Sequence, residues 1–236
     1  MLRKSIISAA LCLLSFSASF AQTNRYEVKF DDFTQLKMRD NININYKSNP
    51  DSAGMAVFYS TAEVAPHIVF SSNKGKLTVE FANKKNKPAN PPTVTVYSRF
   101  ITLAENQSDS TITLSNVNSG PQLKLRVMGN GKLIAEDLNA VEVSASITTG
   151  NGLLVVSGNC DKANITNMST GTVQADKLIA KDVKCKLIGT GSIGCTPLNY
   201  LSIAGAGTGK VYYFGSPKTI ENNAIKIKLI AMDEQE

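Results

Sequence analysis

The chain has 236 residues with a formal charge of +6; 42% are apolar, 19% are charged and none is tryptophan. A chain of this length and apolar content can bury one substantial hydrophobic core, so a single folded domain is the simplest expectation. Helical periodicity is hard to find along the chain, so the pattern disfavours an α-helical fold and favours an all-β one.

The first 21 residues have the three parts of a secretory signal peptide. Two cations near the start precede the apolar run Ile6–Phe16, and small residues in Ser19–Ala21 suit a cleavage site. The run is too short for a membrane span, which needs about 20 apolar residues. Cys12 falls too early for a lipoprotein box, so we expect cleavage before Gln22, no lipid anchor and no transmembrane span.

Export decides which partners are reasonable. Loss of the segment 1–21 leaves 23 cationic and 19 acidic residues, a formal charge of +4. That charge permits contact with anionic glycans or phospholipid head groups, although a merely solvated basic surface is the simpler interpretation. An exported protein rarely meets nucleic acid. We therefore expect a periplasmic, cell-surface or extracellular protein that binds no nucleic acid.

Several short alternating segments predict strands before residue 121. They are Tyr26–Phe30, Phe33–Met38, Asn41–Tyr46, Met55–Ser60, Lys76–Phe81, Thr93–Tyr97 and Thr111–Leu114. The proline- and lysine-rich stretch 83–92 predicts a loop, since proline cannot donate to a ladder; it is read as a solvated loop rather than a basic binding finger. Glu105–Asp109 is read as a polar turn. The segment 25–82 is interpreted as irregular coils that cap the N-terminal end.

A short glycine turn recurs five times between Leu123 and Tyr213. The turns are Gly129-Asn130-Gly131, Gly150-Asn151-Gly152, Ser169-Thr170-Gly171, Gly189-Thr190-Gly191 and Gly207-Thr208-Gly209. Their last glycines are 21, 19, 20 and 18 residues apart. A period of about 20 residues indicates a repeat architecture in which each unit packs only on its neighbours. The glycines are expected to serve as structural turns, because a sharp arch needs positive φ.

Apolar residues alternate on both sides of each turn, in columns that keep their register from repeat to repeat. One such column contains Leu125, Ile165, Cys185 and Ile203, and another, seven residues after each turn, contains Leu138, Leu178 and Leu198. The second repeat, which begins at Val141, fits only with one extra residue before its turn. In a stack of hairpins each strand would pair with its partner across the turn. In a parallel β-helix each strand pairs with the equivalent strand one repeat later, so that equivalent residues stack on one another. The constant register of the columns favours the β-helix, and parallel crossovers are expected to be right-handed.

These residues resemble a known family. Alternating strands around a repeated Gly-x-Gly, closed by Tyr213-Phe214-Gly215-Ser216-Pro217, are similar to the head GIN domain family, also called "putative auto-transporter adhesin". The resemblance covers roughly Phe33 to the end of the chain, and it departs from the family in the Asn or Thr between the glycines and in Ser169. It implies a secreted β-helical protein common in Bacteroidetes, with adhesion inferred from shape and with no catalytic residues to transfer.

The predicted organisation is one domain, 22–236, in which regular repeats span 121–217. After them, Ile225, Ile227 and Leu229 alternate with lysines, which predicts a final strand over 224–230 whose lysines protect an exposed edge.

Motifs that resemble catalytic or cofactor sites fit the repeats better. Gly189–Gly194 matches a dinucleotide fingerprint, but strand and corner residues follow it where a helix is required. Gly207–Lys210 resembles part of a phosphate loop and lacks its first glycine and its final Ser or Thr. His67 is the only histidine and is read as a surface loop residue, so no zinc site or catalytic triad is expected. No catalytic, cofactor or metal residue is proposed from the sequence.

Three cysteines remain after cleavage: Cys160, Cys185 and Cys195. An odd number leaves at least one thiol unpaired within a monomer. Cys185 and Cys195 lie symmetrically about the Gly189–Gly191 turn and should face each other inside the coil. Facing sheets are about 10 Å apart, beyond the reach of a disulfide, so two buried thiols are preferred to a bridge.

Two classes of function remain open. The first is a non-enzymatic envelope or surface protein whose sheet faces bind a glycan or another protein. The alternative is a carbohydrate-active β-helix enzyme, which needs carboxylates clustered on one outer face. The outward acidic positions are few and form no evident pair: Glu136, Asp137, Glu142, Asp161, Asp176 and Asp182. The first class is therefore preferred.

Overall fold

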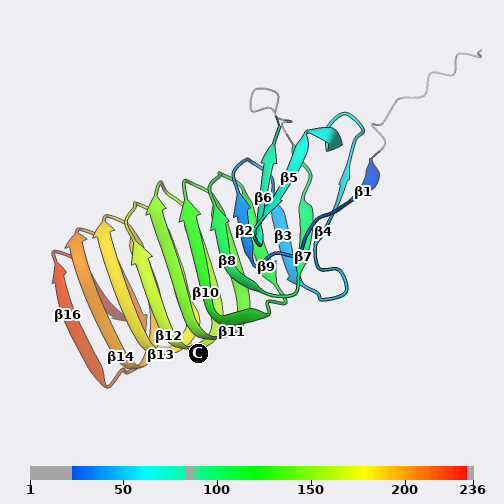
Figure 1. The fold of residues 1–236 in the computed structure, drawn as a ribbon. Helices are drawn as coiled ribbons and strands as arrows, with labels where there is room; N and C mark the ends of the chain where they lie inside the picture. The colour runs from blue at the N-terminus through cyan, green and yellow to red at the C-terminus, as the bar shows by residue number, and fades with distance from the viewer. Residues whose placement is uncertain (1–22, 83–87, 89, 233–236) are drawn as a thin grey trace, which may run out of the picture.

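The computed structural model describes residues 23–82, 88 and 90–232, which form strands and one short 3-10 helix, η1 (Ala65–His67) (Figure 1). The signal-peptide prediction and most of the predicted loop 83–92 lie outside the described residues. The strands are β1 (Asn24–Lys29), β2 (Gln35–Met38), β3 (Ile44–Ser48), β4 (Met55–Ser60), β5 (Ile68–Asn73), β6 (Lys76–Phe81), β7 (Val94–Ser98), β8 (Ile101–Asn106), β9 (Thr111–Ser115), β10 (Ser119–Met128), β11 (Lys132–Thr149), β12 (Leu153–Asn167), β13 (Thr172–Gly189), β14 (Ser192–Gly207), β15 (Lys210–Phe214), β16 (Thr219–Ile225) and β17 (Lys228–Met232).

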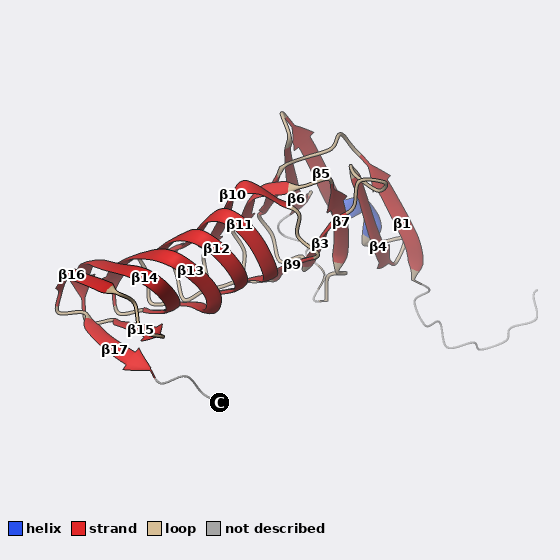
Figure 2. Ribbon diagram, turned by 90° about the horizontal axis from the view of Figure 1, so that it is seen from below, coloured by secondary structure: helices blue, strands red, loops and turns tan. Residues whose placement is uncertain are grey.

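The second half of the chain winds into stacked parallel coils. Each of β11 to β14 bends partway along, so that its first part pairs in one sheet and its last part in another. The first sheet contains β10, the ends of β11 to β14, and β16; the second contains the starts of β11 to β14, then β15 and β17. Figure 2 shows the coils as successive rungs. The predicted β-solenoid of about 20-residue coils is confirmed.

The N-terminal coils are stacked out of chain order. In the first sheet β2 pairs with β6 on one side and β8 on the other, and in the second sheet β3 lies between β7 and β9. The coil formed by β2 and β3 is therefore inserted between two coils that follow it in the sequence. Antiparallel strands then cover the end, with β5 on β6, β4 on β7 and β1 on β4. Within the segment 25–82, β2, β3 and β6 pair in the parallel stack, whereas β1, β4 and β5 are antiparallel strands at its end.

An aromatic cluster fills the core beneath these antiparallel strands. The rings of Tyr26 and Phe58 stack with centroids 5.5 Å apart, and Phe30 stacks on Phe70 at 6.0 Å. Such pairs contribute beyond the area that they bury. The N-terminal end of the core is thereby closed by large side chains as well as by backbone pairing.

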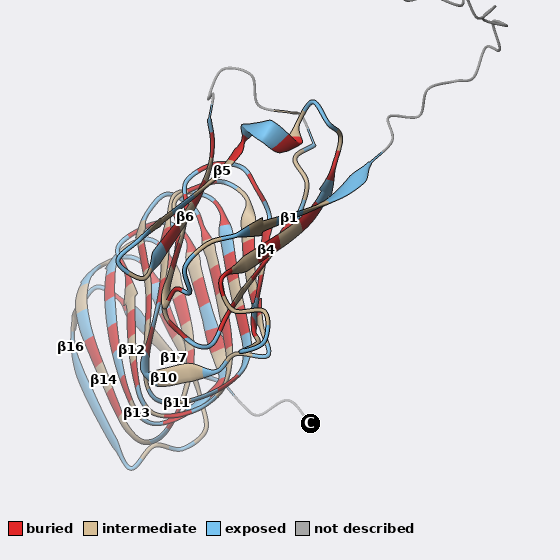
Figure 3. Cartoon of the chain, turned by 45° about the vertical axis from the view of Figure 1, so that its right-hand side comes forward, coloured by how far each residue is buried: buried red, intermediate tan, exposed pale blue. Residues whose placement is uncertain are grey.

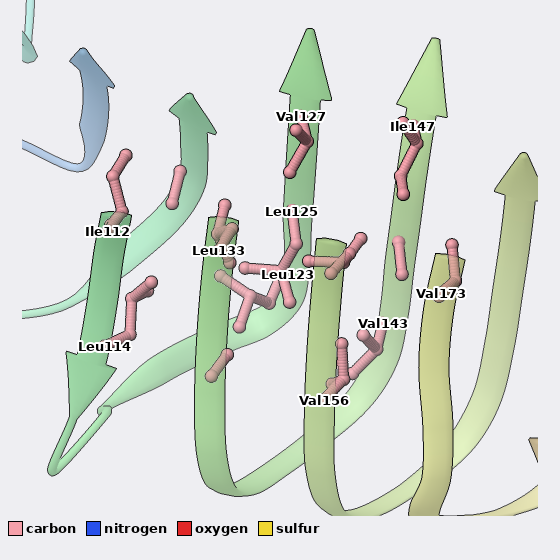
Figure 4. Close-up of a cluster of buried hydrophobic side chains, with 14 of the residues drawn as sticks. Ile112, Leu114, Leu123, Leu125, Val127, Leu133, Val143, Ile147, Val156 and Val173 are labelled. Carbon is pink, nitrogen blue, oxygen red and sulfur yellow. The ribbon is translucent and has the colours of Figure 1, made fainter. Parts of the chain in front are cut away.

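The predicted inward columns are buried. Leu125 pairs in register through Ala145 with Ile165, and the column continues to Cys185 and Ile203. All of these side chains are buried, and Figure 4 shows the neighbouring columns, among them Leu123 and Val143, pointing between the two sheets. In Figure 3 buried and exposed positions alternate along the strands. The period-2 pattern therefore identified the core correctly.

The predicted extra residue in the second repeat is also found. Val127 pairs with Ile147, but Met128 pairs with Thr149, so Thr148 is the additional residue at a β-bulge.

Two apolar positions assigned to the columns face solvent instead. Leu198 is 51% exposed and Val141 is 54% exposed, whereas Leu138 and Leu178 are buried as predicted. At Leu198 the reason is a shorter corner in this later coil, where Ala180 pairs with Pro197 after a register shift. Pro197 takes the buried position at this corner, and Leu198 lies one residue beyond it.

The turn predicted at Glu105–Asp109 is wrong in its first half. Glu105 and Asn106 are the last residues of β8, and both are buried. The strands β5 and β8 were not expected from the sequence, because polar residues interrupt their alternation.

The predicted final strand 224–230 is also wrong, since it is divided between two sheets. β16 ends at Ile225, Lys226 has φ of 60°, and β17 begins at Lys228. The segment is a further arch of the solenoid that lacks glycine. Within the described chain, β16 and β17 pair on one side only, with β14 and β15.

The cysteine prediction is confirmed. Cys185 and Cys195 face each other across the core with their sulfur atoms 3.9 Å apart, and all three described cysteines are free and buried. The mutual hydrogen bond and burial raise the pKa of the Cys185 thiol. Both residues therefore act as small apolar side chains in their columns.

Candidate functional site

The five predicted glycine turns are the arches that join the first sheet to the second. They follow the arrowheads of β10 to β14 along the upper edge of Figure 1. Positive φ occurs at the first glycine of an arch, as at Gly189 with φ of 112°. The same is true of Gly129, Gly150 and Gly207.

The second glycine of each arch serves a different purpose. A Cβ added there would lie closer than 3.0 Å to an atom of the preceding coil, at Gly131, Gly152, Gly171, Gly191 and Gly209 alike. At Gly191 it would be 2.5 Å from the carbonyl oxygen of Gly171. The expectation of positive φ at Gly191 was therefore wrong, and close approach of the backbones is the reason for glycine at that position.

The arch with serine in place of a glycine has its own hydrogen-bond network. The buried Asn167 occupies the column of Ile147 and Leu187, and its Nδ2 donates to the carbonyl oxygens of Gly171 and Ser192. Its Oδ1 accepts from the Ser169 N–H and hydroxyl, at 3.1 and 2.6 Å. The side chains thus satisfy an arch that other coils form with glycine.

A second copy of this network, which the sequence analysis missed, lies three coils earlier. Asn106 Nδ2 donates to the carbonyl oxygens of Ser110 and Lys132, and Asn106 Oδ1 accepts from Ser108. The shared pattern Asn-x-Ser, repeated in the same column, could have revealed it.

A hollow of about 520 Å³ lies on the outer face of the first sheet, over the ends of β11 to β13 and the middle of β14. It is lined only by polar side chains and one aromatic ring: Glu142, Lys162, Asn164, Asp182, Lys184 and Tyr200. We call this group the outer-face hollow. None of the predicted turn glycines contributes to it, because they lie at the arches beyond the strand ends.

The outer-face hollow is built by the 20-residue register. Glu142 pairs with Lys162, and Lys162 pairs with Asp182, so two carboxylates flank one ammonium in neighbouring coils. The next register step places Tyr200 beside Asp182. Since neighbouring strands are about 4.8 Å apart, these groups form a row at regular spacing.

Hydrogen bonds hold the ends of this row. Asn164 Nδ2 donates to Glu142 Oε1 at 2.8 Å, and Gln122 Nε2 donates to Glu142 Oε2 at 3.2 Å. The Tyr200 hydroxyl donates to Glu221 Oε2 at 2.6 Å, and this bond raises the pKa of the Tyr200 phenol. The carboxylate of Glu142 and the phenol of Tyr200 are therefore each held in a defined orientation.

Of the six outward acidic residues considered from the sequence, the structure brings only Glu142 and Asp182 into this hollow. Asp161 pairs with Lys181 at 2.7 Å. Sequence reasoning did not select Lys162, Asn164, Lys184 or Tyr200. Outward positions that recur at the coil period could have pointed to them.

The same outer face carries a charged cluster over β2, β8 and β10. Glu105 accepts from Lys37 and Arg126, each at 3.0 Å, and only 8% of its side chain is exposed. Burial by itself raises the pKa of this carboxyl, but the hydrogen bond and charge of Lys37, with Arg126, outweigh it and hold the pKa below its ordinary value. The cluster ties three coils together and leaves Glu105 ionised.

The motifs that resembled cofactor sites lie in arches. Gly189–Gly194 joins β13 to β14 with no helix following, and Gly207–Lys210 joins β14 to β15. His67 is exposed in η1. Within residues 23–82, 88 and 90–232, no group of three or more His, Cys, Asp or Glu residues could hold a metal ion. Nor does this part of the chain contain a helix long and apolar enough to cross a membrane.

Stacked parallel coils with a polar outer face define the chain as a β-solenoid protein. Residues 32–217 match the family described as "Putative auto-transporter adhesin, head GIN domain", and the chain belongs to this family. The match ends at Pro217, the last residue of the closing motif noted in the sequence.

Solved structures from Bacteroidetes share the fold. A putative adhesin from Bacteroides fragilis NCTC 9343 has a TM-score of 0.76 at 20% identity, with 90% of this chain and 97% of that chain covered. A putative adhesin from Parabacteroides distasonis ATCC 8503 has a TM-score of 0.70 at 18% identity, with coverage of 91% and 98%. A structure from the same organism, described as a putative lipid binding protein, has a TM-score of 0.64 at 16% identity, with coverage of 90% and 98%. No functionally curated protein matches the chain.

Proposed function

We propose that the chain is an exported, non-enzymatic binding protein of the cell envelope or surface, and that its outer-face hollow binds a saccharide. The observation that carries this proposal is the combination of groups in the hollow. The ring of Tyr200 provides an apolar platform beside the carboxylate of Asp182, and the amide of Asn164 lines the same hollow two coils away. A saccharide presents apolar ring faces and hydroxyl groups, and it matches both kinds of partner.

The rigidity of the scaffold supports binding at this hollow. Its residues lie on strands whose backbones are paired on both sides, between β10 and β16. A site built on such strands loses little conformational freedom when a ligand binds. The family name and the neighbours described as putative adhesins agree with a binding role for a surface of this kind.

A carbohydrate-active enzyme is the alternative, and the geometry favours it less. Glu142 and Asp182 lie two coil steps apart, about 9.6 Å along the sheet, close to the upper limit for an inverting pair of carboxylates. Lys162 stands in register between them, where the bond to be cleaved would need to lie. Asn164 and Gln122 also occupy both oxygens of Glu142.

A glycan array probed with residues 22–236 tests the proposal. We expect specific binding that Tyr200→Ala and Asp182→Asn each weaken at least tenfold, while Tyr59→Ala, an exposed tyrosine near the N-terminal end, leaves binding unchanged. Binding that survives both hollow variants would place the site elsewhere. Cleavage of a bound polysaccharide, lost in Glu142→Gln, would favour the enzyme.

The export proposal has a separate test. The native protein should begin at Gln22 when its intact mass or N-terminal sequence is determined. A retained Met1 or a diacylated Cys12 would contradict it.

A further inference from the structure

The arches of the C-terminal coils expose apolar side chains in a row. Met168 is 46% exposed, Ile188 is 39% exposed and Ile225 is 64% exposed. The register places Ile188, Ala206 and Ile225 in one column across adjacent coils. Met168 and Ile188 line a shallow hollow of about 480 Å³ beside Thr170 and Thr190.

Lysines surround this row without any acidic residue among them. The arch segments 166–173, 186–192, 204–211 and 223–229 contain four lysines and no aspartate or glutamate. Lys186 precedes Ile188 by two residues and so points to the same side of its strand. Lys210 pairs in register with Lys228, and Lys226 lies at the tip of the last arch. All four are exposed.

We call the apolar residues Met168, Ile188 and Ile225 with these four lysines the arch ridge. Because the arches stack at one coil step of about 4.8 Å, the row from Met168 to Ile225 extends about 14 Å along one straight edge of the solenoid. In Figure 1 this edge is the upper left of the molecule, where β13, β14 and β16 end. A straight edge can rest on a flat surface with all of its arches in contact.

We propose that the arch ridge docks on an anionic phospholipid surface. Exposed apolar side chains beside cations are the features of proteins that lie in the membrane interface, where apolar groups enter the acyl boundary and lysines meet the head groups. A soluble anion would satisfy the lysines alone and leave the apolar row exposed. The bilayer satisfies both, and this complementarity selects it as the occupant.

The arch ridge and the outer-face hollow share no residue, although Lys186 of the ridge lies two residues after Lys184 of the hollow on the same side of β13. The ridge proposal therefore stands or fails independently of saccharide binding.

The test is co-sedimentation of residues 22–236 with vesicles of phosphatidylcholine alone or mixed with phosphatidylglycerol. We expect binding only to the anionic vesicles, weakened by salt. Each lysine should contribute about fivefold to the partition constant. The variant Lys186→Gln/Lys210→Gln/Lys226→Gln/Lys228→Gln should therefore lose measurable binding.

The matched control removes the same charge elsewhere. Lys47→Gln/Lys76→Gln/Lys177→Gln/Lys181→Gln changes four other exposed lysines and should bind at least tenfold more tightly than the ridge variant. Ile188→Ser/Ile225→Ser, with all lysines kept, should bind anionic vesicles at least fivefold more weakly than the parent chain. Both ridge variants should keep the parent's circular dichroism spectrum and melting midpoint, since the replaced side chains are exposed.

Three results would overturn the proposal. They are equal binding to both kinds of vesicle, equal loss in the two lysine variants, and unchanged binding of the Ile188→Ser/Ile225→Ser variant. The first would show that charge is not recognised, the second that the ridge is not the contact, and the third that no apolar group enters the bilayer. Failure of saccharide binding by Tyr200→Ala would bear on none of them.

Discussion

At the scale of single residues, the two glycines of an arch meet different physical requirements. Gly189 adopts a left-handed backbone conformation that costs other residues roughly 1–2 kcal/mol. Gly191 has no such conformation and is limited by the backbone of the preceding coil. A side chain at Gly191 would therefore push two coils apart rather than strain one residue.

We predict that Gly191→Ala lowers the free energy of unfolding by about 1–3 kcal/mol, the range for overpacking a rigid interior. The preceding backbone cannot move away from the new Cβ without breaking the Gly191 N–H to Ser169 O bond of 3.1 Å. Thr190→Ala, at the exposed tip of the same arch, should change stability by no more than about 0.5 kcal/mol. Chemical denaturation of both variants decides this. Equal midpoints would mean that the arches do not limit the spacing of the coils.

Glu105 is a charged residue whose contribution depends on pH. Its folded pKa lies below the ordinary value of 4.5, so its stabilisation is fully present above pH 4.5 and is lost as the pH falls through the lowered value. Glu105→Gln should cost about 1–3 kcal/mol at pH 7, because Lys37 and Arg126 lose their shared acceptor charge. The difference in free energy of unfolding between Glu105→Gln and the parent chain should become smaller below pH 4.5. Urea denaturation across this pH range is the measurement.

An exposed pair provides the comparison for Glu105. Glu27 pairs with Arg25, and both side chains are about half exposed. Glu27→Gln should change stability by less than about 1 kcal/mol at any pH. A stability gap for Glu105→Gln that stays constant down to acidic pH would show that the charge of Glu105 does not stabilise the fold.

At the scale of elements, the solenoid builds its arches in two ways. One uses an apolar column residue with two glycines, as in Leu187 followed by Gly189 and Gly191. The other uses a buried asparagine with a serine, as in Asn167 and Ser169. In the second kind of arch the asparagine side chain bonds to the Ser169 N–H and to the carbonyl oxygens of Gly171 and Ser192, and a leucine at this position can make none of these bonds.

The coupling between Asn167 and Ser169 can be measured in a double-mutant cycle. Asn167→Leu should lower the free energy of unfolding by about 1–3 kcal/mol, since the buried Ser169 N–H loses its acceptor and the carbonyl oxygens of Gly171 and Ser192 each lose a donor. Adding Ser169→Gly reproduces the Leu-x-Gly-x-Gly arch of the next coil and should recover at least half of that loss. Additive effects of the two changes would show that the asparagine and serine do not form one unit.

At the scale of the whole molecule, stability is distributed along a stack with unlike ends. The N-terminal end is covered by antiparallel strands and aromatic rings, whereas β16 and β17 pair on one side only within the described chain. In a stack that is held by nearest-neighbour interfaces, coils with two partners open less often than those with one.

Amide hydrogen exchange should therefore be slowest in β12 and β13 and fastest in β1, β16 and β17. The inserted coil of β2 and β3 should exchange as slowly as its neighbour β8, although it lies near the start of the chain, since it has partners on both sides. Amide exchange rates that increase steadily toward the N-terminus would contradict the position of β2 and β3 between later coils.

The sequence by itself determined the repeating part of this protein. The alternation of apolar residues can be read within each short strand, and it recurs every 20 residues or so. These two patterns predicted the inward column of Leu125 and Ile165 and the facing thiols of Cys185 and Cys195. Only the tertiary structure decided the insertion of β2 and β3 between later coils, because strand pairing across long sequence separations leaves no periodic signal. It also decided the burial of Glu105, which depends on Lys37 and Arg126 from two other coils. The residues of the outer-face hollow recur at the coil period, but only the stacked structure shows that they enclose a hollow.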